Sequence, residues 1–189
     1  MIYVALLRGI NVGGNNKINM KKLKETFEKA GMSHVTTYIN SGNIIFSSEV
    51  QSNEELSLQL EQAILEDFSL PIRVIVRNIT EIQNIMKALP KEWSNDTQMK
   101  SDVLFLWDEI NDISVLEKLP LKRGIGNVMY TPGAILFSVS KENVTKSGMT
   151  KLVGSSLYKH MTVRNVNTTR QIYKLMQMAE QEELRDTDS

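Results

Sequence analysis

Short apolar runs alternate with amphipathic segments along the first 90 residues. Apolar runs too short for a helix predict strands, and apolar positions that recur every three or four residues predict helices. In chain order, the pattern predicts a strand, a helix, two strands, a helix and a strand, over residues 2–7, 20–30, 35–38, 43–47, 53–68 and 72–77. This β-α-β-β-α-β order is that of a ferredoxin-like (split βαβ) unit, in which both helices cover one face of the sheet.

Residues with strong positional preferences mark the ends of the two helices. Asn19 and Ser52 are suited to accept hydrogen bonds from the first turn of a helix, and Glu55 completes a capping box with Ser52. Gly31 stands where a left-handed residue ends the first helix. A further helix over residues 80–89, ended by Pro90, is expected to join this unit to the next.

The second half of the chain repeats the first weakly but in order. Val103–Leu106 resembles Val4–Leu7, and Tyr130–Ser138 resembles Tyr38–Ser47 with a shorter turn. Helices near 113–119 and 150–158 and an extended piece at 162–163 would complete a second unit, followed by a final helix over 168–184. We therefore predict an α+β fold of two tandem ferredoxin-like units with antiparallel or mixed sheets and a C-terminal helix. The predicted domains are residues 1–90 and 91–189.

Composition narrows the functional classes. The 189 residues are 41% hydrophobic and 23% charged, which is typical of a globular protein. The chain has no cysteine and two histidines, so no disulfide, thiolate zinc site or other metal site is expected. It shows no basic leader and no run of eighteen apolar residues, and a cytoplasmic location is expected.

Charge argues against a protein whose main task is to grip nucleic acid. The net charge is zero, although residues 8–24 and 141–174 form two basic stretches. Ferredoxin-like sheets that bind RNA usually expose aromatic side chains, whereas alternation places Phe46 on the core side. Arg73, Ile75 and Arg77 would share the opposite face, which leaves room for phosphate contact.

The segment after the first strand, RGINVGGNNK, is the first candidate site. Free backbone N–H groups between a strand and a helix favour an anion, and Arg8, Asn11, Gly13 and Gly14 are its candidate ligand-binding residues. It is not a P-loop, because Asn15 and Asn16 replace the required Lys and Ser/Thr. The competing interpretation is a loop whose glycines only permit positive φ.

Two further polar segments extend the candidate site. Ser41 and Asn43 lie in the turn between the predicted third and fourth elements, where the second half of the chain has TPGA instead. Arg164 and Asn165 precede the last helix and could bind an anion. Thr168 with Gln171 is the predicted capping box of that helix. All of these polar residues also have conformational explanations.

The motifs LLRGINVGG, YINSGNIIF and T-x-RN-x-NT resemble those of the bacterial domain of unknown function 1697 family. The resemblance covers essentially the whole chain and implies a two-part α+β fold of ferredoxin-like character, without an established activity. Val166 departs from the family pattern, in which a tryptophan often follows the Arg-Asn pair.

Three functional hypotheses follow. The first is binding of a small anionic or nucleotide-like ligand between the two units by Arg8, Asn11, Gly13, Gly14, Ser41, Asn43, Arg164 and Asn165. The alternatives are a nucleic-acid-binding module that uses the basic stretches, and a ligand-free scaffold whose polar motifs dock the units. The sequence identifies no cofactor and no acid–base pair, so it leaves catalysis undecided.

Overall fold

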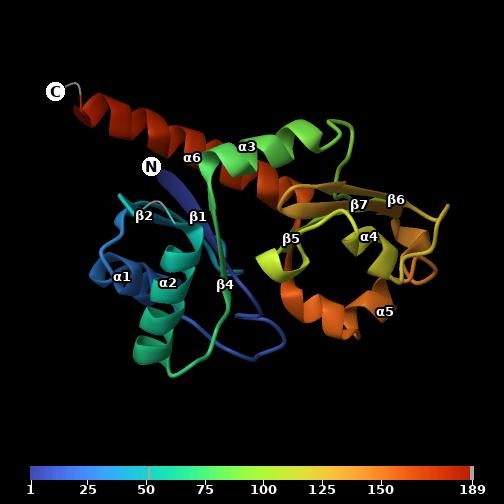
Figure 1. Cartoon of the computed structure of the whole chain (residues 1–189), viewed down its shortest axis with the longest axis horizontal. Coiled ribbons are helices and arrows are strands. Elements are labelled where there is room, and N and C mark those ends of the chain that lie inside the picture. The colour runs from blue at the N-terminus through green and yellow to red at the C-terminus, as the bar shows by residue number, and fades with distance from the viewer. Residues whose placement is uncertain (51, 188–189) are drawn as a thin grey trace. The chain divides into compact units, whose positions relative to one another are not determined.

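The chain folds as an α+β protein with two four-stranded antiparallel sheets and a long C-terminal helix (Figure 1). The computed structural model describes residues 1–50 and 52–187. The chain divides into two compact units: unit 1 comprises Met1–Ile82 and Ile172–Ser189, and unit 2 comprises Gln83–Gln171. The predicted domain boundary between residues 90 and 91 stays a prediction, because a compact unit need not fold independently.

Unit 1 contains the predicted β-α-β-β-α-β elements. They are β1 (Ile2–Leu7), α1 (Met20–Lys29), β2 (Ser33–Tyr38), β3 (Asn43–Ser47), α2 (Asn53–Phe68) and β4 (Val74–Asn78). The strand order is β2-β3-β1-β4, so β1 and β3 are the central strands. The predicted caps are confirmed: Asn19 accepts from the N–H of Lys22, and Ser52 accepts from the N–H of Glu55.

A continuous apolar core joins one face of this sheet to α1 and α2. Phe27 of α1 and Leu60 of α2 are fully buried against Tyr3, Ile44 and Phe46 of the sheet. The rings of Tyr3 and Phe46 stack with centroids 5.6 Å apart, and Phe27 meets Phe46 edge-on at 5.8 Å. Burial of each such aromatic side chain stabilises the fold by about 2–3 kcal/mol. Phe46 therefore faces the core, as predicted.

Unit 2 has the same sheet with shorter helices. Its strands are β5 (Met99–Leu106), β6 (Asn127–Thr131), β7 (Ala134–Ser140) and β8 (Met161–Asn165), in the order β6-β7-β5-β8. Its helices are α4 (Val115–Lys118) and α5 (Met149–Val153), with single 3-10 turns η1 (Asp108–Ile110), η2 (Lys141–Asn143) and η3 (Ser156–His160). The predicted helix over 150–158 was too long, because Gly154 ends α5 and η3 follows as a separate turn.

Two helices cross the division between the units. Helix α3 (Ile79–Ala88) follows β4, and α6 (Val166–Thr187) follows β8. Across the described residues, no helix has the length and apolar character needed to cross a membrane. The cytoplasmic location expected from the sequence stays a prediction.

Equivalent backbone hydrogen bonds recur in the two sheets. The N–H of Leu7 donates to Gly42 at 2.9 Å, and that of Leu106 donates to Gly133 at 3.0 Å. Ile44 pairs with Ala5 just as Ile135 pairs with Leu104, so the G-x-I-x-F-S part of the repeat has one register.

The predicted equivalence of Tyr38 and Tyr130 in that repeat is wrong. Tyr38 lies opposite Asn43, whereas Tyr130 lies opposite Ile135, one position further along its partner strand. The turns differ by two residues rather than one. Because side chains alternate along a strand, the two tyrosines are not equivalent.

Both faces of each sheet are buried along most of the central strands, whereas the edge strands β2 and β6 are partly exposed. On the face of sheet 1 away from α1 and α2, Val4 and Leu6 have no exposed surface, Ile75 is 1% exposed and Arg77 is 7% exposed. Antiparallel sheets commonly leave one face to solvent and then show alternating polar residues. The expectation that Arg73, Ile75 and Arg77 form an open face for phosphate contact is therefore wrong for Ile75 and Arg77, whereas Arg73 is half-buried.

A Val-Arg-Asn motif ends the last strand of each unit, and the sequence interpretation missed its repetition. Nη1 of Arg77 donates to the carbonyl of Val76, and Nη1 of Arg164 donates to that of Val163, both at 2.9 Å. The asparagines that follow each accept a 2.9 Å hydrogen bond in the next helix, Asn78 from the N–H of Glu81 and Asn165 from the N–H of Thr168. The prediction that Thr168 caps α6 is wrong, because Thr168 lies inside that helix and Asn165 is the residue that caps it.

The cap of α6 gives a testable prediction. Asn165→Ala removes the acceptor for the first turn, and we expect it to lower the free energy of unfolding by about 1 kcal/mol in a urea titration. Asn165→Asp keeps the acceptor and should retain most of that stability. Gln177→Ala, an exposed change in the same helix, is the matched control. Equal losses for the Ala and Asp variants would contradict the capping role.

Ile39, in the turn between β2 and β3, gives a second prediction. It is a β-branched residue with a φ of +49°, and its side chain is 49% exposed. Such a residue is strained in the left-handed region, whereas asparagine tolerates it. We expect Ile39→Asn to raise the free energy of unfolding by about 1 kcal/mol, measured by urea titration. Ile39→Val keeps the branch and should bring no gain; an equal gain from both would show that strain is not the cause.

Candidate functional site

The asparagine–glycine loop, residues 8–19, connects β1 to α1 and is the candidate site of unit 1 (Figure 1). Ile10 and Ile18 are 1% and 5% exposed and fasten its two ends to the core. Between them, the chain forms a tight turn in which Val12 and Asn15 form an isolated bridge. Residues 12–17 are exposed, so the tip of this loop is open to a ligand.

Asn11 closes the base of the loop. Its Nδ2 donates to the carbonyl of Ile18 at 3.1 Å and to that of Asn40 at 2.8 Å, and its Oδ1 accepts from the N–H of Ile18 at 2.8 Å. The side-chain amide of Asn16 adds a further hydrogen bond, in which its Nδ2 donates to the carbonyl of Gly9 at 3.0 Å. These bonds tie the loop to itself and to the β2–β3 turn, so Asn11 holds the site in shape.

Gly42 allows the β2–β3 turn to approach the loop. Its φ is +81°, and a Cβ there would lie 2.7 Å from Cβ of Leu7 and 2.9 Å from Cδ1 of Ile10. Any side chain would push the turn away from the end of β1. The glycine thereby brings Asn40, two residues earlier, within reach of Asn11.

A cavity of about 410 Å³ lies beside this junction. The residues that line it are Asn11, Gly14, Lys17, Ile18, Asn19, Met20 and Asn40. Lys17 supplies the charge among these described residues, and none of them is acidic. The first turn of α1 also begins here, where unpaired N–H groups of a helix favour negative charge. The cavity is thus electrostatically suited to an anion.

The sequence-predicted residues of unit 1 divide into two groups. Asn11 and Gly14 line the cavity, and Gly13 lies in the exposed tip of the loop. Asn43 is fully buried, and its Nδ2 donates to the carbonyl of Tyr38 at 3.1 Å and to Oγ of Ser41 at 2.9 Å. These two bonds shape the turn.

Arg8 is half-buried at the end of β1, and its backbone N–H donates to the carbonyl of Arg73 at 3.0 Å. The predicted meeting of Arg8 with Arg164 stays a prediction, since Arg8 belongs to unit 1 and Arg164 to unit 2.

Arg164 and Asn165 hold local positions in unit 2. Arg164 is 7% exposed and donates to Oγ1 of Thr162 at 3.0 Å as well as to the carbonyl of Val163. Burial lowers the pKa of Arg164 to about 10, and its guanidinium is still protonated at neutral pH. Asn165 uses its side-chain oxygen to cap α6.

Sequence reasoning missed three polar lining residues of the unit 1 cavity, namely Lys17, Asn19 and Asn40. Lys17 stands in the acid-free stretch 8–24, and Asn40 belongs to the same turn as Ser41. Asn19 was assigned only as a helix cap. Each of these residues stands in a segment that the sequence analysis singled out. Only the structure shows that the segments surround one cavity.

Among the described residues that line this cavity, none carries a carboxylate or an imidazole. No group of three acidic or histidine side chains that could hold a metal ion occurs in the described part of the chain.

Comparison with known proteins places the chain in a family. The family model for "Protein of unknown function (DUF1697)" matches residues 1–137. The solved structure of conserved bacterial protein SP0830 from Streptococcus pneumoniae is similar, with 30% identity and a TM-score of 0.78 over 93% of this chain and 98% of that one. A search of curated proteins gave no match. The chain belongs to the DUF1697 family of proteins of unknown function.

Proposed function

We propose that unit 1 binds a small anionic, nucleotide-like ligand in the cavity of the asparagine–glycine loop. The observation that carries this proposal is an acid-free cavity of about 410 Å³ with Lys17 in its wall and the start of α1 at its edge. A phosphate or carboxylate there gains a charge-assisted hydrogen bond from the ammonium group and the favourable end of the helix dipole.

The amides around the cavity support a ligand with an uncharged polar part. The side-chain amide of Asn40 carries both a donor and an acceptor, and Asn19 retains its amide donor because its oxygen caps α1; such groups suit the edge of a base or the hydroxyls of a sugar. Gly14 has no side chain to block close approach of the ligand to the backbone. The volume lies within the range of about 300–1,000 Å³ that is usual for small-molecule sites.

The two alternatives have less support. A sheet surface for RNA would need exposed aromatic side chains, whereas Tyr3 and Phe46 on the strands of sheet 1 are buried. If the loop had only a structural role, the hydrogen bonds of Asn11 would be explained. The presence of Lys17 and Asn40 around an open cavity would not be explained.

We further infer that the two units are tandem ferredoxin-like copies. Their shared strand order and the repeated Val-Arg-Asn motif support this inference. Superposition of the two sheets in an experimental structure would test it. The inference fails if β3 and β7 do not superpose when β1 is fitted on β5.

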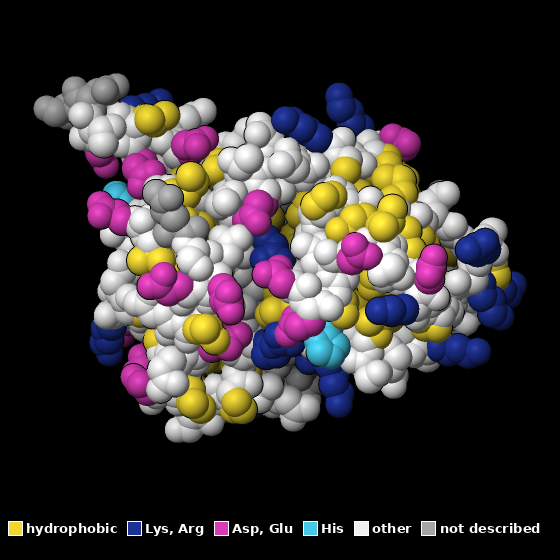
Figure 2. All heavy atoms as spheres, in the orientation of Figure 1, with side chains coloured by type: hydrophobic (Ala, Val, Ile, Leu, Met, Phe, Trp, Pro, Cys, Tyr) yellow, Lys and Arg dark blue, Asp and Glu magenta, His cyan; other side chains and the backbone are white. Residues whose placement is uncertain are grey.

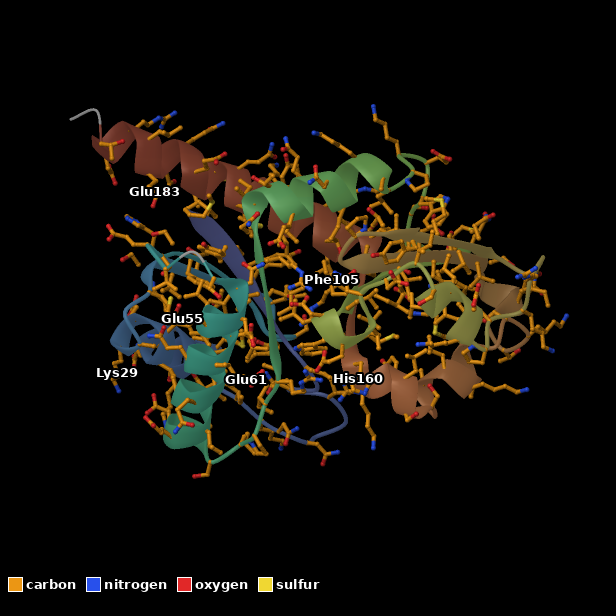
Figure 3. All side chains as sticks on the ribbon, in the orientation of Figure 1. Lys29, Glu55, Glu61, Phe105, His160 and Glu183 are labelled. Atoms are coloured by element: carbon orange, nitrogen blue, oxygen red, sulfur yellow. The ribbon has the colours of Figure 1, made fainter. Side chains whose placement is uncertain are left out.

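Binding of AMP, measured by isothermal titration calorimetry, tests the proposed function. We expect AMP to bind more tightly than adenosine, because only AMP carries the phosphate that meets Lys17. Lys17→Gln should weaken AMP binding by about tenfold, as expected when one charge-assisted bond is lost. Lys29→Gln is the matched control: it removes the same charge from the exposed last residue of α1 (Figure 3).

Two results would contradict this assignment. One is equal affinity of the wild-type protein for AMP and adenosine, or binding of neither. The other is equal weakening by Lys17→Gln and Lys29→Gln, which would indicate a diffuse effect of net charge.

A further inference from the structure

Unit 2 contains a second cavity, of about 480 Å³, that the predicted site does not include. Its polar wall is made by Lys118, Lys151, Ser156 and His160. Its apolar wall includes Ile110, Pro120 and Leu157. None of the described residues that line it is acidic. Figure 2 shows Lys and Arg side chains gathered around the end of unit 2 that holds α4, α5 and β6.

Backbone contacts fix the two sides of this cavity. Lys118 is the last residue of α4, and Lys151 lies in α5. Gly148, just before α5, has a φ of +90°, and a Cβ there would clash with the carbonyl oxygen of Pro120. The adjacent N–H of Lys122 donates to the carbonyl of Ser147 at 2.8 Å. The segment before α5 is thus packed directly against the segment after α4, which holds the two lysines around one space.

His160 forms the third side, at the end of η3 where β8 begins (Figure 3). Its carbonyl accepts from the N–H of Trp107 at 3.0 Å, which anchors its backbone to the end of β5. Its Nδ1 is buried without a hydrogen-bond partner. Leaving a buried polar atom without a hydrogen-bond partner is unfavourable, and His160 also lines the cavity.

We propose that this cavity binds a phosphate monoester with a compact apolar group. The two ammonium groups would neutralise a dianionic phosphate, and the imidazole and the Ser156 hydroxyl would donate hydrogen bonds to its oxygens. Ile110, Pro120 and Leu157 would contact the apolar group.

The carboxylate of Asp112 does not line the cavity. Hydrogen bonds from Ser114 lower the pKa of Asp112, and Lys118 makes a smaller contribution to the same shift. Lys118 therefore interacts electrostatically with an exposed carboxylate. A ligand phosphate would be a second, doubly charged partner for the same ammonium group.

This proposal is independent of the proposed function of unit 1. Its lining residues all lie between Ile110 and His160, within unit 2, and none belongs to the asparagine–glycine loop. Failure of either site leaves the other untouched.

Calorimetric titration of the full chain with phenyl phosphate tests the proposal. We expect phenyl phosphate to bind more tightly than phenol or inorganic phosphate. Only phenyl phosphate has both a phosphate for the polar wall of the cavity and a ring for its apolar wall. The double variant K118Q/K151Q should weaken binding at least tenfold, and His160→Gln should weaken it severalfold. Lys159→Gln and Lys29→Gln, which change exposed lysines that line neither cavity, should leave the affinity unchanged.

Thermal unfolding of each variant provides the folding control, since Lys118 and Lys151 are exposed and their replacement should leave the melting temperature unchanged. The proposal is overturned if the wild-type protein does not bind phenyl phosphate, or if the folded double variant binds it as tightly as the wild type. It is also overturned if Lys17→Gln abolishes binding, which would assign phenyl phosphate to unit 1.

Discussion

Burial of both faces of the central strands of each sheet is the constraint on which the rest of this structure depends. All six residues of β1 and all five of β3 are buried, and Val103–Leu106 of β5 are at most 1% exposed. Such strands leave little room for polar chemistry on the sheet itself. Both cavities lie outside the strands: the loop after β1 lines one, and α4, α5 and η3 contribute to the other.

The same constraint explains the Val-Arg-Asn motif. Arg77 and Arg164 lie at the ends of edge strands, where burial penalises the charged guanidinium. Hydrogen bonds to neighbouring backbone carbonyls offset part of that penalty, and the lowered pKa of Arg164 records what remains. The next residue, an asparagine in both units, ends the strand and caps the following helix. One short motif thus performs the strand-to-helix transition twice.

Much of the fold could be predicted from the sequence because its apolar runs are short and well separated. The strands of unit 1 and the caps at Asn19 and Ser52 follow from local pattern. The short helices of unit 2 were harder, since α4 and α5 are too brief to show a helical period. Tyr38 and Tyr130 were wrongly predicted to be equivalent because the strand register depends on the length of the turn. The sequence alone does not show how many residues a turn contains.

The candidate sites were harder to predict from the sequence than the fold. Asn11 and Gly14 could be identified because they stand in one unusual segment that also contains Lys17. The unit 2 cavity could not, because its residues are spread from Ile110 to His160 and form no motif. The burial of His160 Nδ1 without a hydrogen-bond partner is a property of the folded chain alone.

We propose that the ligand contacts of unit 1 come from the loop after β1 and not from the sheet. An amide ¹H–¹⁵N NMR titration with AMP distinguishes these two locations. We expect the largest chemical-shift changes for Gly13, Gly14, Lys17 and the first turn of α1, and only small changes for the amides of the buried strands β1 and β3. Larger shifts along β1 and β3 than in the loop, or no change in the loop at all, would contradict this proposal.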